Sequence, residues 1–219
     1  MNVFPEHNAV FSVSGPAGKL EAAIDFPSAY SAATSVVIIC HPHPPDGGSM
    51  SNKVVSTLAK AFTESGFISI RFNFRGVGQS EGGYDKGRGE LADCLAILQW
   101  LQGQRSQAAI ALAGFSFGAW VALKAAESVL PVLMVSIAPP VGFRDFNDVQ
   151  HPHCPWLAVQ GEADEVVDVA GVFAWLNKQQ PKPEIIAMPD TSHFFHGKLV
   201  PLRGHVKDFL AKHIDLATR

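Results

Sequence analysis

The segment AAIALAGFSFGAWVALKAA occupies residues 108–126 of the chain. Residues 108–113 are uninterrupted small and apolar residues, as in a strand buried on both faces, and residues 117–128 are typical of a helix. The pattern G-x-S-x-G lies between them, with Ser116 at its centre. A sharp turn between a strand and a helix lifts such a hydroxyl out of the sheet, and the glycines let the two elements pass closely. The segment therefore predicts a nucleophile at Ser116.

A second G-x-S-x-G match lies at residues 78–82 and has Ser80 at its centre. It runs on into GGYD at residues 82–85, which is typical of a loop and not of a helix. A nucleophile at this kind of turn needs a strand before it and a helix after it. We therefore expect Ser80 to be a turn residue.

Strands and helices alternate along the rest of the chain. A β-hairpin is expected over residues 8–14 and 19–26, followed by strands at 35–40, 67–74, 108–113, 132–138, 156–160 and 184–188 and by helices at 51–65, 88–102, 117–128, 169–178 and 199–217. On the helix 88–102, the buried face is expected to carry Leu91, Leu95, Leu98 and Leu101. The alternation predicts a single α/β domain over residues 1–219, in which helices cover both faces of a mostly parallel, twisted sheet. In such sheets, ligands bind beyond the carboxyl ends of the strands.

A serine nucleophile needs a base, and the base needs an acid that orients it. At this kind of turn the acid comes next in the chain and the histidine last. His193 lies in the loop after the predicted strand 184–188, where it can reach over Ser116. His196, three residues further on, is the alternative base.

The acid is expected directly after the strand 156–160, in the segment GEADEVVD at residues 161–168. Asp164 stands at the middle of this turn, before two valines return the chain to the core, and is the favoured residue. Glu162 and Glu165 are the alternatives. Asp168 is placed to cap the following helix.

Negative charge that develops on a carbonyl oxygen is usually stabilised by two backbone N–H groups. One is expected from Phe117, the residue after the nucleophile. The other is expected from the loop HPHPPDGG at residues 41–48, whose three prolines have no N–H. His43 is favoured, and Gly47 and Gly48 are the alternatives.

The chain resembles the α/β-hydrolase superfamily over nearly its whole length. The resemblance is to small bacterial serine hydrolases without a cap, related to dienelactone hydrolases and esterases, and it rests on HPHPPDGGSMSNKVV (41–55), RFNFRGVGQSEGG (71–83), GFSFG (114–118), GEADEVV (161–167) and SHFFHGKL (192–199). It implies a triad of Ser116, Asp164 and His193, with oxyanion donors at Phe117 and His43. It also implies cleavage of a carboxylic ester or thioester through an acyl-serine, without a cofactor. The first segment departs from many members in having HP where they have HG.

A lid is often inserted in this superfamily before the strand that carries the acid. Here residues 139–155 supply only about 17 residues, and 142–149 is the one candidate helix among them. The chain therefore resembles a cap-less enzyme.

Candidate substrate-pocket residues lie close to these motifs in the sequence. They are Met50, Arg75, Phe115, Trp120 and Phe194. Aromatic side chains at these places suit an apolar acyl pocket, but core packing explains each of them equally well.

Other readings of the sequence remain open. The same fold and nucleophile also serve acyl transfer to an alcohol and peptide or amide cleavage. More distant alternatives are a non-catalytic binding module and a metal-dependent hydrolase that uses two histidine clusters, His41 with His43 and His151 with His153 and Cys154, brought together at the sheet edge.

Composition limits the classes of partner. The 219 residues carry a formal charge of −3, so no strong positive field attracts nucleic acid. Three cysteines do not form a disulfide framework. Residues 1–6 lack the features of a signal peptide, and the apolar stretch 129–143 is broken by prolines, so a cytoplasmic protein without a membrane partner is expected. The expected partner is a small ester or thioester, and the sequence gives no oligomeric state.

Overall fold

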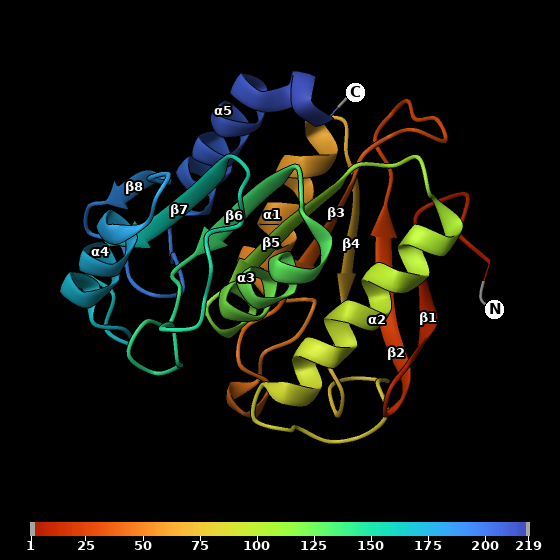
Figure 1. The fold of residues 1–219 in the computed structure, drawn as a ribbon, viewed down its shortest axis with the longest axis horizontal. Coiled ribbons are helices and arrows are strands. Elements are labelled where there is room, and N and C mark those ends of the chain that lie inside the picture. Colours follow the sequence, from red (N-terminus) through yellow and green to blue (C-terminus); the bar gives the residue numbers. More distant parts are fainter. Residues whose placement is uncertain (1–2, 218–219) are drawn as a thin grey trace.

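The computed structural model describes residues 3–217, and the side chains as far as residue 213. Residues 1 and 2, part of the segment in which no signal peptide is expected, lie outside the described residues. In the described part of the chain, eight strands form one twisted sheet in the order β1-β2-β4-β3-β5-β6-β7-β8 (Figure 1). Their bounds are β1 Ala9–Gly15, β2 Gly18–Asp25, β3 Val36–Cys40, β4 Ile68–Phe72, β5 Ile110–Phe115, β6 Leu133–Ile137, β7 Trp156–Gly161 and β8 Glu184–Met188. The strands β1 and β2 form an antiparallel hairpin, and β2 pairs antiparallel with β4. The six strands β3 to β8 are parallel to one another.

Helices cover both faces of the sheet, which confirms the predicted α/β architecture (Figure 1). The helices are α1 Lys53–Glu64, α2 Arg88–Gln104, α3 Phe117–Val129, α4 Val169–Lys178 and α5 Leu199–Ala217, with a short 3-10 turn η1 at Pro44–Asp46. One core cluster contains the buried sides of α2, α3 and α4, and the other contains those of α1 and α5. Within residues 3–217, none of these helices is long and apolar enough to cross a membrane.

The central strands are buried on both sides, as the apolar runs in the sequence predict. Val37 and Ile39 of β3 belong to the α1/α5 cluster, and Ile38 and Cys40 belong to the other. Each fully buried aliphatic side chain of this kind contributes about 1.5–3 kcal/mol. The two-sided core therefore holds these strands in the middle of the sheet, and the residues that follow them lie together at its carboxyl edge.

The buried face of α2 differs from the leucine stripe expected from the sequence. Leu91 and Leu95 are only partly buried, while Glu90 and Asp93 are fully buried. Both carboxylates have partners: Asp93 pairs with Arg75 at 2.7 Å, and Glu90 accepts hydrogen bonds from two backbone N–H groups of the loop before α2. Because these partners offset the cost of burying a charge, the helix turns its carboxylates inward.

The expected helix at residues 142–149 does not form. Phe143 and Arg144 donate their backbone N–H groups to Pro140 in turns. Phe146 and Val149 anchor the segment to the core. Pro139 and Pro140 begin the segment and a positive φ at Gly142 interrupts it, which explains why no continuous helix is built here.

Candidate active site

Ser116 lies at a strained turn between β5 and α3, as the sequence predicts. Its φ is 53° and its ψ is −122°, a conformation that side-chain-bearing residues rarely adopt. A Cβ on Gly114 would lie 2.2 Å from the Gly118 oxygen, and a Cβ on Gly118 would lie 2.2 Å from the Cys40 oxygen. The two glycines therefore allow the strand and the helix to cross, and the crossing holds Ser116 at the carboxyl edge of the sheet.

Three side chains from three strand ends meet at this edge. The Ser116 Oγ lies 3.0 Å from His193 Nε2, and His193 Nδ1 lies 2.8 Å from Asp164 Oδ2. Ser116 is 9% exposed, His193 is 3% exposed, and the Asp164 carboxylate is fully buried. With Nδ1–H donating to the carboxylate, Nε2 is left as an acceptor for the serine hydroxyl. The arrangement can therefore move a proton from Ser116 to His193.

The Asp164 carboxylate is held by several donors. Its Oδ1 accepts the N–H groups of Val166 at 2.9 Å and Val167 at 3.0 Å. Its Oδ2 also accepts the side-chain amide of Gln160, a buried residue at the end of β7, at 2.9 Å. Burial alone would raise the pKa of Asp164, but the hydrogen bonds from His193 and from these backbone groups lower it below its ordinary value. Asp164 therefore carries its charge at neutral pH.

The alternative acids and the alternative base lie elsewhere. Glu165 accepts the backbone N–H of His193 at 3.1 Å, and Glu162 is exposed. His196 is exposed and contacts Phe194. Asp168 stands at the start of α4, as expected, but its side chain makes no capping hydrogen bond.

His41 is a structural residue at the end of β3. Its Nδ1–H donates to the Pro42 carbonyl at 2.7 Å, and its Nε2 accepts the N–H of Phe74 at 3.1 Å. Burial lowers the pKa of His41 to about 4, so the ring is neutral at pH 7. Through these two bonds, His41 ties the loop after β3 to the loop after β4.

The loop after β3 leaves few free backbone donors. Gly47 donates its N–H to Pro44 at 3.1 Å, and Gly48 donates to His43 at 3.0 Å. Within residues 3–217, no such bond engages the N–H of His43 or that of Phe117, the first residue of α3. His43 and Phe117 both line the pocket that contains Ser116.

That pocket has a volume of about 210 Å³. It is lined by His43, Asp46, Ser116, Phe117, Pro140, Phe143, Arg144, Val166 and Val167. Most of these residues follow the carboxyl ends of β3, β5, β6 and β7. Arg144 and Phe143 are not among the pocket residues expected from the sequence, in which residues 139–155 are interpreted only as a possible lid. The sequence feature that points to them is their position shortly after the predicted strand 132–138, at the edge where ligands bind.

The five side chains expected in the pocket are not among its lining residues. Met50 is buried, Arg75 is ion-paired to Asp93, and Phe115 is buried beside the His193 ring. Trp120 donates its indole N–H to the Asp145 carbonyl. Phe194 is exposed and packs against Phe115 and His193. Core packing, the other explanation of the aromatic residues, fits Phe115 best.

Ser80 is a buried turn residue, as expected. Its Oγ accepts the N–H of Glu21 at 2.9 Å and donates to the Asn73 carbonyl at 2.7 Å. The second G-x-S-x-G match therefore ties the RGVGQS loop to β2.

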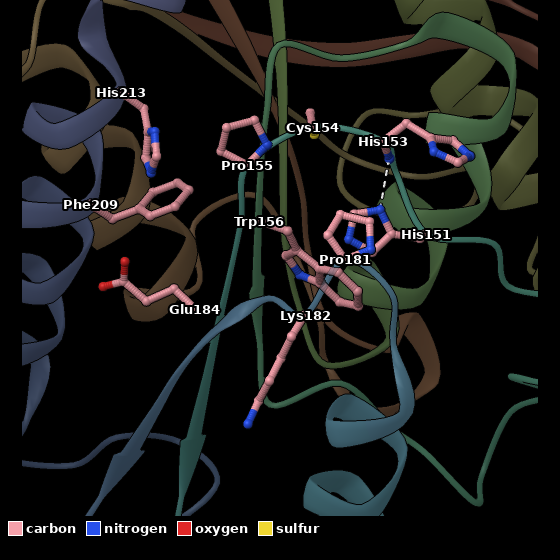
Figure 2. A pocket seen from close by; sticks show the side chains of 10 residues that line it. All are labelled: His151, His153, Cys154, Pro155, Trp156, Pro181, Lys182, Glu184, Phe209 and His213. Atoms are coloured by element: carbon pink, nitrogen blue, oxygen red, sulfur yellow. Dashed lines mark hydrogen bonds between the residues drawn. The ribbon is translucent and has the colours of Figure 1, made fainter.

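The two histidine clusters lie at opposite edges of the sheet, so the expectation that they meet is wrong. His41 and His43 follow β3, whereas His151 and His153 precede β7, which runs parallel to β3. Figure 2 shows the second cluster in a cavity between the start of β7 and α5, where His151 accepts the backbone N–H of His153. In the described part of the chain, no three His, Cys, Asp or Glu side chains are grouped so that they could hold a metal ion.

Known proteins match both the sequence and the fold. The family model for X-Pro dipeptidyl-peptidase (S15 family) matches residues 17–156. XC6422 from Xanthomonas campestris, an α/β serine hydrolase without a lid, is 46% identical, with a TM-score of 0.92 over 97% of each chain. An α/β serine hydrolase homologue from Coxiella burnetii is 45% identical, with a TM-score of 0.89 over 94% of this chain and 99% of that one. The uncharacterized protein RP471 of Rickettsia prowazekii is 34% identical over 90% of this chain and 86% of its own. The chain therefore belongs to the α/β serine hydrolases, in the family that the S15 model describes, and it has the fold of the members without a lid.

Proposed function

We propose that the protein hydrolyses a small carboxylic ester or thioester through an acyl-serine intermediate. The observation that carries the proposal is the hydrogen-bonded series Ser116–His193–Asp164, with 3.0 Å and 2.8 Å between successive heavy atoms. A serine hydroxyl is a weak nucleophile until a neighbouring base takes its proton. The short distance from His193 to Ser116 and the buried, charged carboxylate of Asp164 support these roles.

The reaction proceeds in two halves. Ser116 Oγ attacks the carbonyl carbon while His193 Nε2 takes the hydroxyl proton. The tetrahedral intermediate collapses, the bond to the alcohol or thiol breaks, and His193 returns the proton to that leaving group. Water then attacks the acyl-serine, gives its proton to His193, and releases the acid as Ser116 regains its proton. Asp164 keeps the imidazole in the required tautomer and stabilises its charged form.

The negative charge on the carbonyl oxygen would be bound by the backbone N–H groups of Phe117 and His43. Both residues line the pocket that holds Ser116. The competing donors Gly47 and Gly48 are engaged with carbonyls of their own loop. Loss of one such donor costs about 3–4 kcal/mol in an oxyanion hole.

Peptide cleavage is the second candidate, because the family model is named for a dipeptidyl-peptidase. The matched residues 17–156 include Ser116 but stop before Asp164 and His193. The match therefore supports the shared fold and nucleophile more than a shared substrate.

A substrate panel tests the proposal. The purified protein and the Ser116→Ala variant would be assayed with 4-nitrophenyl butyrate, a butyryl thioester and an aminoacyl-prolyl 4-nitroanilide. We expect the ester or thioester to be turned over only by the protein with Ser116. Turnover of the anilide with higher kcat/KM than both would favour the peptidase instead.

A further inference from the structure

The pocket beside Ser116 is lined by one arginine, Arg144, and one carboxylate, Asp46, and most of its other lining residues are apolar. Arg144 faces it together with Phe117, Phe143 and Val166. A cavity of about 150 Å³ accepts a molecule the size of benzene. The volume of about 210 Å³ therefore suits a short acyl or aryl group and places anything bound there within a few atoms of Arg144.

Arg144 is fixed in place by four neighbours. Its guanidinium carbon lies 4.8 Å from the centre of the Phe117 ring and 5.7 Å from that of Trp120. One terminal nitrogen donates to the Lys86 carbonyl at 3.0 Å, and the other donates to the Tyr84 hydroxyl at 2.6 Å. Because aromatic faces attract cations, the rings hold the charge without neutralising it.

The charge of Arg144 has no carboxylate partner among the described side chains. Among the same side chains, four other arginines are paired with carboxylates, for example Arg75 with Asp93 and Arg71 with Asp25, whereas Arg105 donates to the Ser31 carbonyl. A guanidinium has five N–H donors, of which Arg144 uses two. Three N–H groups of the guanidinium therefore remain to donate to a carboxylate.

The guanidinium is also connected to the loop after β3. The Tyr84 hydroxyl, which accepts from Arg144, donates to His43 Nε2 at 2.8 Å. His43 Nδ1 in turn lies 2.8 Å from the carboxylate of Asp46, whose side chain is largely exposed. Asp46 therefore interacts with His43 and leaves Arg144 free to receive an anion.

We infer that the substrate of the proposed hydrolysis carries a carboxylate, which Arg144 binds while the ester or thioester carbonyl lies at Ser116. This inference rests on the proposed function and narrows its substrate class to carboxylate-bearing esters. The same cation would repel the terminal ammonium group of a dipeptide substrate.

Matched pairs of esters test the inference. In the first pair the charge is on the leaving group, with 4-acetoxybenzoate compared with its methyl ester. In the second pair the charge is on the acyl group, with monophenyl adipate compared with methyl phenyl adipate. The measured quantity is the ratio of kcat/KM for the charged ester to that for its neutral partner. A charge-assisted hydrogen bond predicts a ratio of about 10 to 100 in at least one pair.

Variants assign the preference to Arg144. Arg144→Gln should lower the ratio about 10- to 100-fold, and Arg144→Lys should retain part of it because the charge remains. Arg203→Gln is the matched control, since Arg203 is paired with Glu64 outside the pocket and the ratio should not change. Thermal unfolding of each variant confirms that it is folded. Ratios near one in both pairs, or a ratio that Arg144→Gln leaves intact, would overturn the inference.

A second readout separates this inference from the proposed function. Labelling of Ser116 by a neutral fluorophosphonate is followed by mass in the presence of benzoate or adipate. These carboxylates should slow the labelling of the wild-type protein and not that of Arg144→Gln. Labelling that carboxylates leave unchanged counts against Arg144 alone. Absence of any labelling at Ser116 contradicts the proposed function, and the inference fails with it.

Discussion

Asp164 shows at the scale of one residue how its surroundings determine its chemistry. Burial opposes its charge, but His193 and two backbone N–H groups favour the ionised form and keep the pKa of Asp164 below its ordinary value. The carboxylate can therefore balance the positive charge that would form on His193 in the proposed reaction.

Replacing this carboxylate tests its role. Asp164→Asn keeps the shape but removes the charge and favours the wrong histidine tautomer, so kcat should fall by about 10³- to 10⁴-fold. Glu165→Gln is the matched control, because its amide oxygen can still accept the His193 N–H, and kcat should change by less than about tenfold. Steady-state kinetics on one ester compares the two. Equal losses of kcat in both variants would contradict the role proposed for Asp164.

At the scale of elements, the site depends on how closely β3, β5 and α3 approach one another. A methyl group on Gly118 would meet the backbone at Cys40, which cannot move without shifting β3. We expect Gly118→Ala to lower the free energy of unfolding by about 1–3 kcal/mol, as overpacking does. Gly204→Ala in α5 is the control, since nothing lies within 4 Å of the added carbon, and it should stabilise the helix by up to about 1 kcal/mol. Urea unfolding measures both, and a harmless Gly118→Ala would contradict the close crossing.

The connection that His41 makes between two loops should depend on pH. The pKa of His41 is about 4 in the folded protein, against an ordinary value of 6.5. As the pH falls, the unfolded chain therefore binds a proton at this residue at a higher pH than the folded protein does. This contribution to stability is complete above about pH 6.5 and is lost as the pH falls toward 4, by about 3 kcal/mol. The unfolding free energy of His41→Gln should depend less on pH over this range than that of the wild-type protein. His196→Gln, at an exposed position, should leave the dependence unchanged.

Much of the element order is predictable from the sequence, because apolar runs and glycines act locally. The sharp turn at Ser116 is predicted by the strand and the helix on either side of it. The leucine spacing does not predict the inner face of α2, because Asp93 and Glu90 are buried against partners in the connection between β4 and α2. Arg75 lies 18 residues before Asp93, and Glu90 accepts the backbone N–H groups of Asp85 and Gly87 just before the helix. The sequence does not indicate Arg144 as a pocket residue, because its neighbours Tyr84 and Phe117 are far from it in the chain.

At the scale of the whole molecule, the parallel strands place the candidate catalytic residues at one edge of the sheet and the second histidine cluster at the other. Ser116, Asp164 and His193 follow β5, β7 and β8 and meet at the carboxyl edge. The cluster of His151 and His153 lies at the opposite edge, just before β7, across a cavity from α5 (Figure 2). Because the strands β3 to β8 all run in the same direction, the polar residues that follow them lie at one edge of the sheet and can act together.

The most direct test of the proposed mechanism is the covalent state of Ser116. The wild-type protein and Ser116→Ala would be treated with a fluorophosphonate and weighed intact, and the adduct would be located by peptide mapping. We predict a single adduct on Ser116 of the wild-type protein and none on the variant. An unlabelled wild-type protein, or an adduct that persists in Ser116→Ala, would contradict an activated serine at this site.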